Sequence, residues 1–104
     1  MSEAKFYIGQ VIEHKLFKYR GVIFDVDDSM QLSEEWYDQV AKSRPPKDNP
    51  WYHVLVDEQT HTTYVAERNL IASVHPEQIK HPQLNDYFDK FENNSYKINS
   101  QHYN

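Results

Sequence analysis

The sequence predicts a mainly β domain, in which a small barrel of about five strands carries a short inserted helix and a C-terminal helix. Two observations predict the sheet: residues 21–27 alternate in side-chain character, and a second β-rich run, PWYHVLVD, begins at Pro50. A third observation predicts the helices, because apolar residues at three- and four-residue spacing mark residues 33–43 and 82–91.

The strands follow from alternation and from turn residues. The first runs from about Tyr7 to His14, with a bend at Gly9. In the second, the opposite face becomes acidic toward the end, and the apolar face holds Val22, Phe24 and Val26. A hairpin and then a last strand follow. Because the turn of the hairpin contains no glycine, its loop is expected to have about four residues. These three strands are expected at Trp51–Asp57, His61–Glu67 and Leu70–Val74.

Capping residues and prolines set the helix boundaries. Ser33 can accept the free amide hydrogens of a helix that ends near Ser43, before Pro45 and Pro46. Its expected buried stripe is Trp36, Tyr37 and Val40. The second helix begins near Pro82 and places one apolar stripe on Leu84, Tyr87, Phe88 and Phe91. Beyond Tyr96 the polar sequence KINSQHYN is expected to fray.

The length of 104 residues indicates a single domain over residues 1–104, with the barrel at about 5–75 and the helix and tail at about 79–104. The chain contains no cysteine, which excludes disulfides and thiolate metal sites. It also contains neither a run of membrane-spanning length nor a signal-peptide core, so a cytoplasmic protein with no membrane partner is expected. The net charge of −5 argues against non-specific attraction to nucleic acid.

No pattern in the sequence indicates catalysis, a cofactor or a metal. The histidines lack metal-ligand spacing, and the hairpin register places His53 opposite Tyr64 rather than His61, so these histidines are interpreted as structural. Asp25, Asp27 and Asp28 resemble the start of an EF-hand loop, but the following Ser29 and Met30 break that motif. Only two glycines are present, too few for a phosphate-binding loop. A non-enzymatic binding protein is therefore predicted.

Two basic windows are the remaining candidates for a binding surface. One alternates with Phe17 and Tyr19, and the other surrounds Pro45 and Pro46. Such windows are either solvated surface loops or contacts to phosphates and bases, and Trp51 is either core or a stacking surface. The candidate DNA-binding residues, expected to gather on one rim, are Lys15, Lys18, Tyr19, Arg20, Arg44, Lys47 and Trp51.

The strings FYIGQVIEHKLFKYRGVIFDVD, RPPKDNPWYHVLVD, TYVAERNL and IKHP, in this order, resemble the HspQ/YccV-like family of hemimethylated DNA-binding and heat-shock proteins. This resemblance implies an SH3-like β-barrel, binding to hemimethylated DNA near the replication origin and association into small homo-oligomers. In some members it implies assistance to the Lon protease in the stress response, which is the alternative function. The chain departs from the family's frequent glycine at Lys18 and its frequent proline at Asp28.

Overall fold

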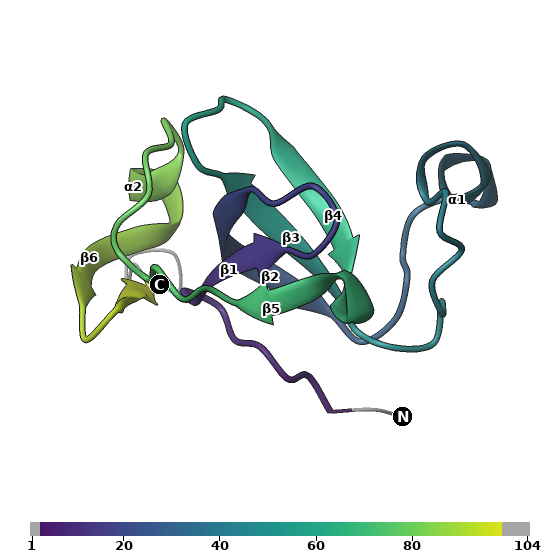
Figure 1. Ribbon diagram of the computed structural model, residues 1–104, viewed down its shortest axis with the longest axis horizontal. Coiled ribbons are helices and arrows are strands. Elements are labelled where there is room, and N and C mark those ends of the chain that lie inside the picture. The colour runs from purple at the N-terminus through teal and green to yellow at the C-terminus, as the bar shows by residue number, and fades with distance from the viewer. Residues whose placement is uncertain (1–2, 99–104) are drawn as a thin grey trace.

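The computed structural model describes residues 3–98, which form a mainly β domain. Figure 1 shows its central antiparallel sheet, whose strand order is β4-β3-β2-β1-β5. The strands are β1 (Val11–His14), β2 (Arg20–Asp27), β3 (Trp51–Val56), β4 (Thr62–Ala66) and β5 (Leu70–Ala72). A 3₁₀ turn, η1 (Glu67–Asn69), joins β4 to β5. The predicted mainly β class and five strands are confirmed, while closure into an SH3-like barrel stays a prediction.

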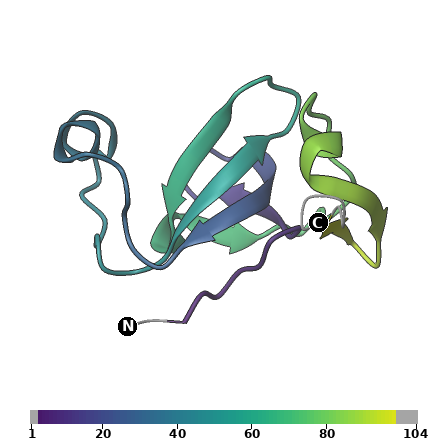
Figure 2. The same cartoon turned by 180° about the vertical axis from the view of Figure 1, so that it is seen from behind.

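The sheet lies between two attachments. Figures 1 and 2 show an arm with helix α1 (Glu34–Val40) at one end and the C-terminal segment at the other. The C-terminal segment comprises α2 (Leu84–Tyr87), β6 (Phe88–Glu92) and β7 (Ser95–Ile98). No helix within residues 3–98 is long and apolar enough to cross a membrane.

The register of the central sheet agrees with the sequence-based prediction at the β3–β4 hairpin but not along β2. His53 lies opposite Tyr64, as predicted. In β2 the register shifts between Ile23 and Asp25, which indicates a β-bulge at Phe24. The expected single apolar face is therefore wrong, since Phe24 packs with one core cluster and Val26 with the other. The bulge reverses which face the following side chains occupy.

Two apolar clusters form the main core. The first joins the sheet to the C-terminal segment through Val11, Val22, Leu55, Ile79, Phe88 and Tyr96. The second lies among the strands and contains Ile12, Ile23, Tyr52, Val54, Val65 and Leu70. A third and smaller cluster lies beneath the α1 arm and is built on Tyr37, Trp51 and Ala66. The arm is therefore packed onto the sheet rather than free in solvent.

The inserted helix begins where the sequence predicts. The Ser33 hydroxyl accepts a hydrogen bond from the amide of Trp36 at 3.1 Å, and α1 ends at Val40, three residues earlier than expected. Tyr37 is buried and Trp36 partly buried, as expected of the stripe. Val40 does not belong to that stripe, contrary to the prediction, because 54% of its surface is exposed.

The predicted C-terminal helix is wrong over most of its length. Only Leu84–Tyr87 is helical, and the remainder forms the β6–β7 hairpin. The turn contains Asn93 and Asn94, both with positive φ angles (55° and 61°), the conformation that tight hairpins require. The expectation of fraying beyond Tyr96 is also wrong for Lys97 and Ile98, which belong to β7, while the rest of that tail lies outside the described residues.

Gly9 joins this hairpin to the central sheet. Its φ angle is 96°, and a Cβ atom there would lie 2.1 Å from the Tyr96 carbonyl oxygen. The Gly9 amide donates to the Ile23 carbonyl, and the Gly9 carbonyl accepts from the Tyr96 amide, both at 2.8 Å. Gly9 therefore lies at the position where only glycine permits both backbones to meet.

Candidate functional site

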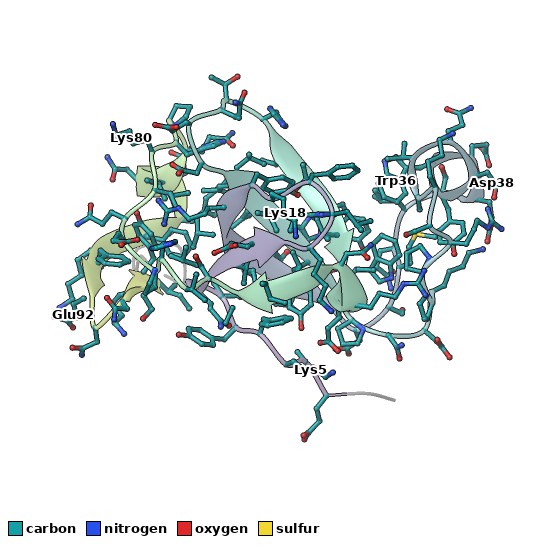
Figure 3. The ribbon with its side chains drawn as sticks, viewed as in Figure 1. Lys5, Lys18, Trp36, Asp38, Lys80 and Glu92 are labelled. Carbon is teal, nitrogen blue, oxygen red and sulfur yellow. The ribbon has the colours of Figure 1, made fainter. Side chains whose placement is uncertain are left out.

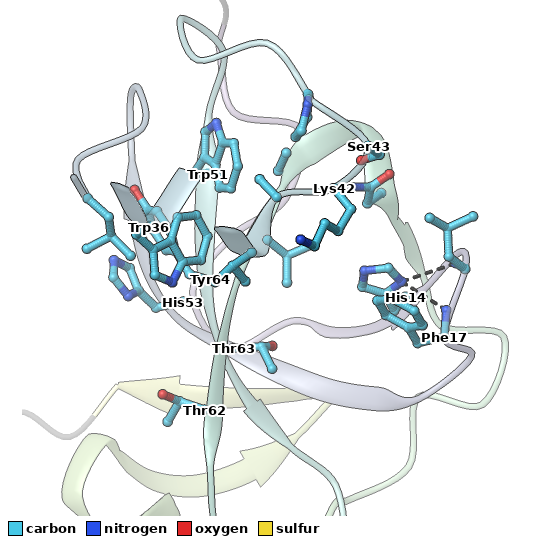
Figure 4. Close-up of a pocket in the computed structure, with 18 of the residues that line it drawn as sticks. His14, Phe17, Trp36, Lys42, Ser43, Trp51, His53, Thr62, Thr63 and Tyr64 are labelled. Atoms are coloured by element: carbon cyan, nitrogen blue, oxygen red, sulfur yellow. Dashed lines mark hydrogen bonds between the residues drawn. The ribbon is translucent and has the colours of Figure 1, made fainter. Parts of the chain in front are cut away.

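A groove opens between the α1 arm and the turn that connects β1 to β2, with β4 as its floor (Figure 4). Its volume is 820 Å³, which lies within the range typical of ligand-binding pockets. Several of the exposed side chains along its rims are apolar: Phe17 is 74% exposed and Leu16 60%. Leu32 and Val40 line the arm side and are also exposed. Exposed apolar groups concentrated around one groove are typical of an interaction site.

Aromatic rings form one side of the groove. The Trp36 ring lies 5.6 Å from the Tyr64 ring and 5.9 Å from the Trp51 ring, both in edge-to-face geometry. Tyr64 in turn lies 4.5 Å from the His53 ring, its partner across the β3–β4 pair. Figure 4 shows Trp36 beside Tyr64 and His53, with Lys42 extending into the groove. The antiparallel register and the Ser33 cap thus bring these rings together.

A small polar cluster fixes this aromatic side. Asp27 Oδ2 accepts a hydrogen bond from the Tyr64 hydroxyl at 2.7 Å and lies 3.0 Å from His53 Nε2. Burial, together with the bond to Asp27, raises the pKa of Tyr64. Asp25, Asp27 and His53 present ligand atoms within 4.8 Å of one another, so these three side chains could hold a cation. The contact between His53 and Asp27 is a hydrogen bond of the kind that the structural interpretation of this histidine expects.

The β1–β2 turn forms the opposite rim and is ordered by His14, which is not among the binding residues predicted from the sequence. His14 Nδ1 accepts hydrogen bonds from the amides of Leu16 and Phe17, both at 3.1 Å (Figure 4). The His14 ring stacks on Phe17 with centroids 4.6 Å apart. Burial lowers the pKa of His14, which favours the neutral acceptor form. The sequence signal that could have indicated this role is the position of His14, two residues before Leu16 and three residues before Phe17.

Two of the candidate residues in this turn lie beside the groove. Lys15 and Lys18 are exposed, and Lys18 has a φ of 65°, the left-handed region that favours glycine. Tyr19 lines the groove and its hydroxyl lies 2.7 Å from Thr63 Oγ1, so it braces the turn against β4. Lys42 lines the groove on the arm side, while Lys15 and Lys18 are exposed on the turn that forms the opposite rim.

Arg20 lies in a different environment. Its Nη1 donates to the carbonyls of His75 at 2.6 Å and Glu77 at 2.9 Å, and its Nη2 pairs with the Asp57 carboxylate at 3.2 Å. These contacts attach residues 75–78 to the end of β3. The guanidinium is therefore occupied by structural partners and is not part of the groove.

Arg44 and Lys47 lie together on the α1 arm but not with the turn lysines. Arg44 pairs with Asp38 at 2.7 Å, Lys47 pairs with Glu34 at 2.6 Å, and both cations stack over the Tyr37 ring. Figure 3 shows Trp36 on the side of the arm facing the sheet and Asp38 on the opposite side, away from Lys18. The structure thus does not gather all the predicted basic residues on one rim, because Arg20, Arg44 and Lys47 are held by carboxylates outside the groove.

Trp51 serves the core as well as the groove. It is 1% exposed, and its Nε1 donates to the Pro46 carbonyl at 3.0 Å, which holds the arm against β3. Trp36, which was not selected from the sequence as a binding residue, presents the more accessible ring. Its position depends on a contact between α1 and β4 that no local pattern encodes.

This geometry defines a small antiparallel β domain with an aromatic groove whose lining includes Lys42. Residues 4–95 match the family model described as YccV-like, hemimethylated DNA-binding protein YccV like. The match covers most of the chain, and the protein therefore belongs to the YccV-like family.

Proposed function

We propose that this domain binds hemimethylated DNA without catalysing a reaction, and that Lys15, Lys18 and Lys42 contact the phosphates. The family description supports DNA as the partner. The observation that carries the assignment of residues is the state of the charges. Within residues 3–98 these three ammonium groups form no ion pair, whereas Arg20, Arg44 and Lys47 are each held by a carboxylate. Unpaired cations can exchange condensed counterions for phosphates without first breaking a protein contact.

The salt dependence of binding tests this assignment. Three phosphate contacts correspond to a slope of about −2.7 in log affinity against log salt, which is a loss of about 40-fold between about 50 and about 200 mM. Replacing Lys15, Lys18 and Lys42 by alanine should remove most of that slope. The matched control, Arg44→Ala with Lys47→Ala, should leave it unchanged. A flattened slope in the control alone would assign the contact to the outer side of the arm.

Recognition of methylation requires a second comparison with three duplexes of one sequence, hemimethylated, fully methylated and unmethylated. The proposal expects the hemimethylated duplex to bind most tightly. Equal affinities with a normal salt slope would reduce the function to general attraction to a polyanion. About three contacts per domain give weak binding, so useful affinity requires several copies on one DNA. This supports the proposal of a small homo-oligomer, testable by light scattering with and without DNA.

A second candidate is docking on the Lon protease, which the family resemblance implies. The exposed apolar side chains of Leu16, Phe17 and Val40 favour a polypeptide contact, because hydrocarbon gains most from burial against another protein. Replacing Leu16 and Phe17 by serine should then abolish association with purified Lon in a pull-down. Retained association would exclude this rim as the docking surface, whatever the result with DNA.

A further inference from the structure

The aromatic side of the groove offers ring faces that an intact duplex cannot use. Trp36 on α1 and Tyr64 on β4 both line the groove, as does Phe17 on the β1–β2 turn. In a stacked duplex the faces of each base are covered by its neighbours, and only base edges and backbone are available. A ring inside the groove can therefore stack only on a base that has left the helix.

We propose, resting on the DNA-binding function above, that the groove receives a single unstacked base of the bound DNA, stacked on Trp36. Three features of the site fit a nucleobase better than a purely apolar ligand. Aromatic faces bind bases irrespective of their sequence. Lys42 extends into the groove, where it can approach the phosphate beside that base. Thr63 on the floor, whose hydroxyl contacts Tyr19, and His53 on the aromatic side add polar groups to the lining.

The same geometry suggests how one methyl group is sensed. Leu16 and Phe17 form an exposed apolar rim facing the aromatic side, so a methyl group on the inserted base would be covered by hydrocarbon. Burying one methyl group favours a methylated base over an unmethylated one by roughly fourfold, but it does not separate hemimethylated from fully methylated DNA. Methyl recognition by this groove is therefore expected to be modest and to depend on that rim.

The test uses two versions of one hemimethylated duplex: one fully paired, and one with an abasic site opposite the methylated base. Unpairing is already complete in the second duplex, so the full-length protein should bind it at least about tenfold more tightly. Trp36→Ala should lose roughly 5- to 100-fold on the abasic-site duplex and keep its salt slope, because the lysines are untouched. Trp36→Phe should retain most of the preference.

The control variant is Tyr7→Ala, which removes an exposed aromatic side chain outside the groove and should change nothing. Thermal unfolding of each variant verifies the fold. Equal binding of the two duplexes by the wild-type protein, with an intact salt slope, would overturn base insertion and leave DNA binding standing. If the wild-type protein bound neither duplex, both base insertion and the proposed DNA binding would be overturned. Unchanged DNA binding by Trp36→Ala would also overturn the inference and return the groove to a polypeptide partner.

Discussion

The His14 imidazole both stacks on the Phe17 ring and accepts a hydrogen bond from the Phe17 amide at 3.1 Å. A single side chain thus fixes the turn that presents the apolar rim of the groove. The arrangement requires an unprotonated Nδ1, since a protonated nitrogen would face two amide donors. The shape of the groove is therefore linked to the protonation state of one buried histidine.

Acid should weaken the turn through His14. Its pKa is lowered in the folded state by burial, so its contribution is complete above the unfolded value of about 6.5 and is lost as the pH falls below it. Thermal unfolding at pH 7.5 and 5.5 measures this loss. His14→Asn places an amide oxygen near the Nδ1 position and should reduce the difference between the two pH values. An identical difference in wild type and His14→Asn would assign the pH dependence to the other histidines.

Arg20 should prove to be a structural residue rather than a DNA contact. Arg20→Ala leaves Asp57 and the carbonyls of His75 and Glu77 without their shared donor, at a loss of about 2 kcal/mol in the free energy of unfolding. Arg20→Lys should recover only part of this lost stability, because an ammonium group lacks the planar set of donors that a guanidinium group has. Urea unfolding measures both. If Arg20→Ala instead kept its stability and flattened the salt slope of DNA binding, the sequence-based assignment of Arg20 would be restored.

Lys18 combines a charge with a backbone conformation that suits glycine. Lys18→Gly should raise the free energy of unfolding by up to about 1 kcal/mol by relieving the left-handed φ of 65°. Lys18→Ala keeps the strain and should not stabilise. Both variants remove one phosphate contact, so each should reduce the salt slope of DNA binding by about 0.9. A slope unchanged in both would show that Lys18 faces away from the DNA.

The parts of the fold that the sequence predicted correctly depend on local signals. Ser33 caps its helix three residues from Trp36, and the hairpin pairs His53 with Tyr64 across a short loop. The partners of the basic residues are not local, since Arg20 meets Asp57 37 residues further along. Likewise, the groove joins Phe17, Trp36 and Tyr64 from three separate segments. No single stretch of the sequence contains such a surface. The prediction of one basic rim took no account of the carboxylates that pair with the basic residues.

The C-terminal error has a local cause that can be tested. Leu84, Tyr87 and Phe88 repeat at helical spacing, yet the chain turns at Asn93 and Asn94, both in the left-handed region. Asparagine is among the few residues that adopt this conformation readily, and Asn-Gly is the preferred pair for such turns. The turn signal therefore outweighs the apolar periodicity in deciding the structure of this segment.

Substitutions at Asn94 measure the strength of that turn. Asn94→Gly should maintain or slightly raise stability, whereas Asn94→Ala should lower the free energy of unfolding by about 1 kcal/mol, because alanine is strained at a φ of 61°. The β6–β7 hairpin buries Phe88 and Tyr96 against the sheet, so its loss should appear as a lower midpoint in urea. Equal stability of the two variants would mean that burial of these rings alone holds the hairpin, with the turn contributing nothing.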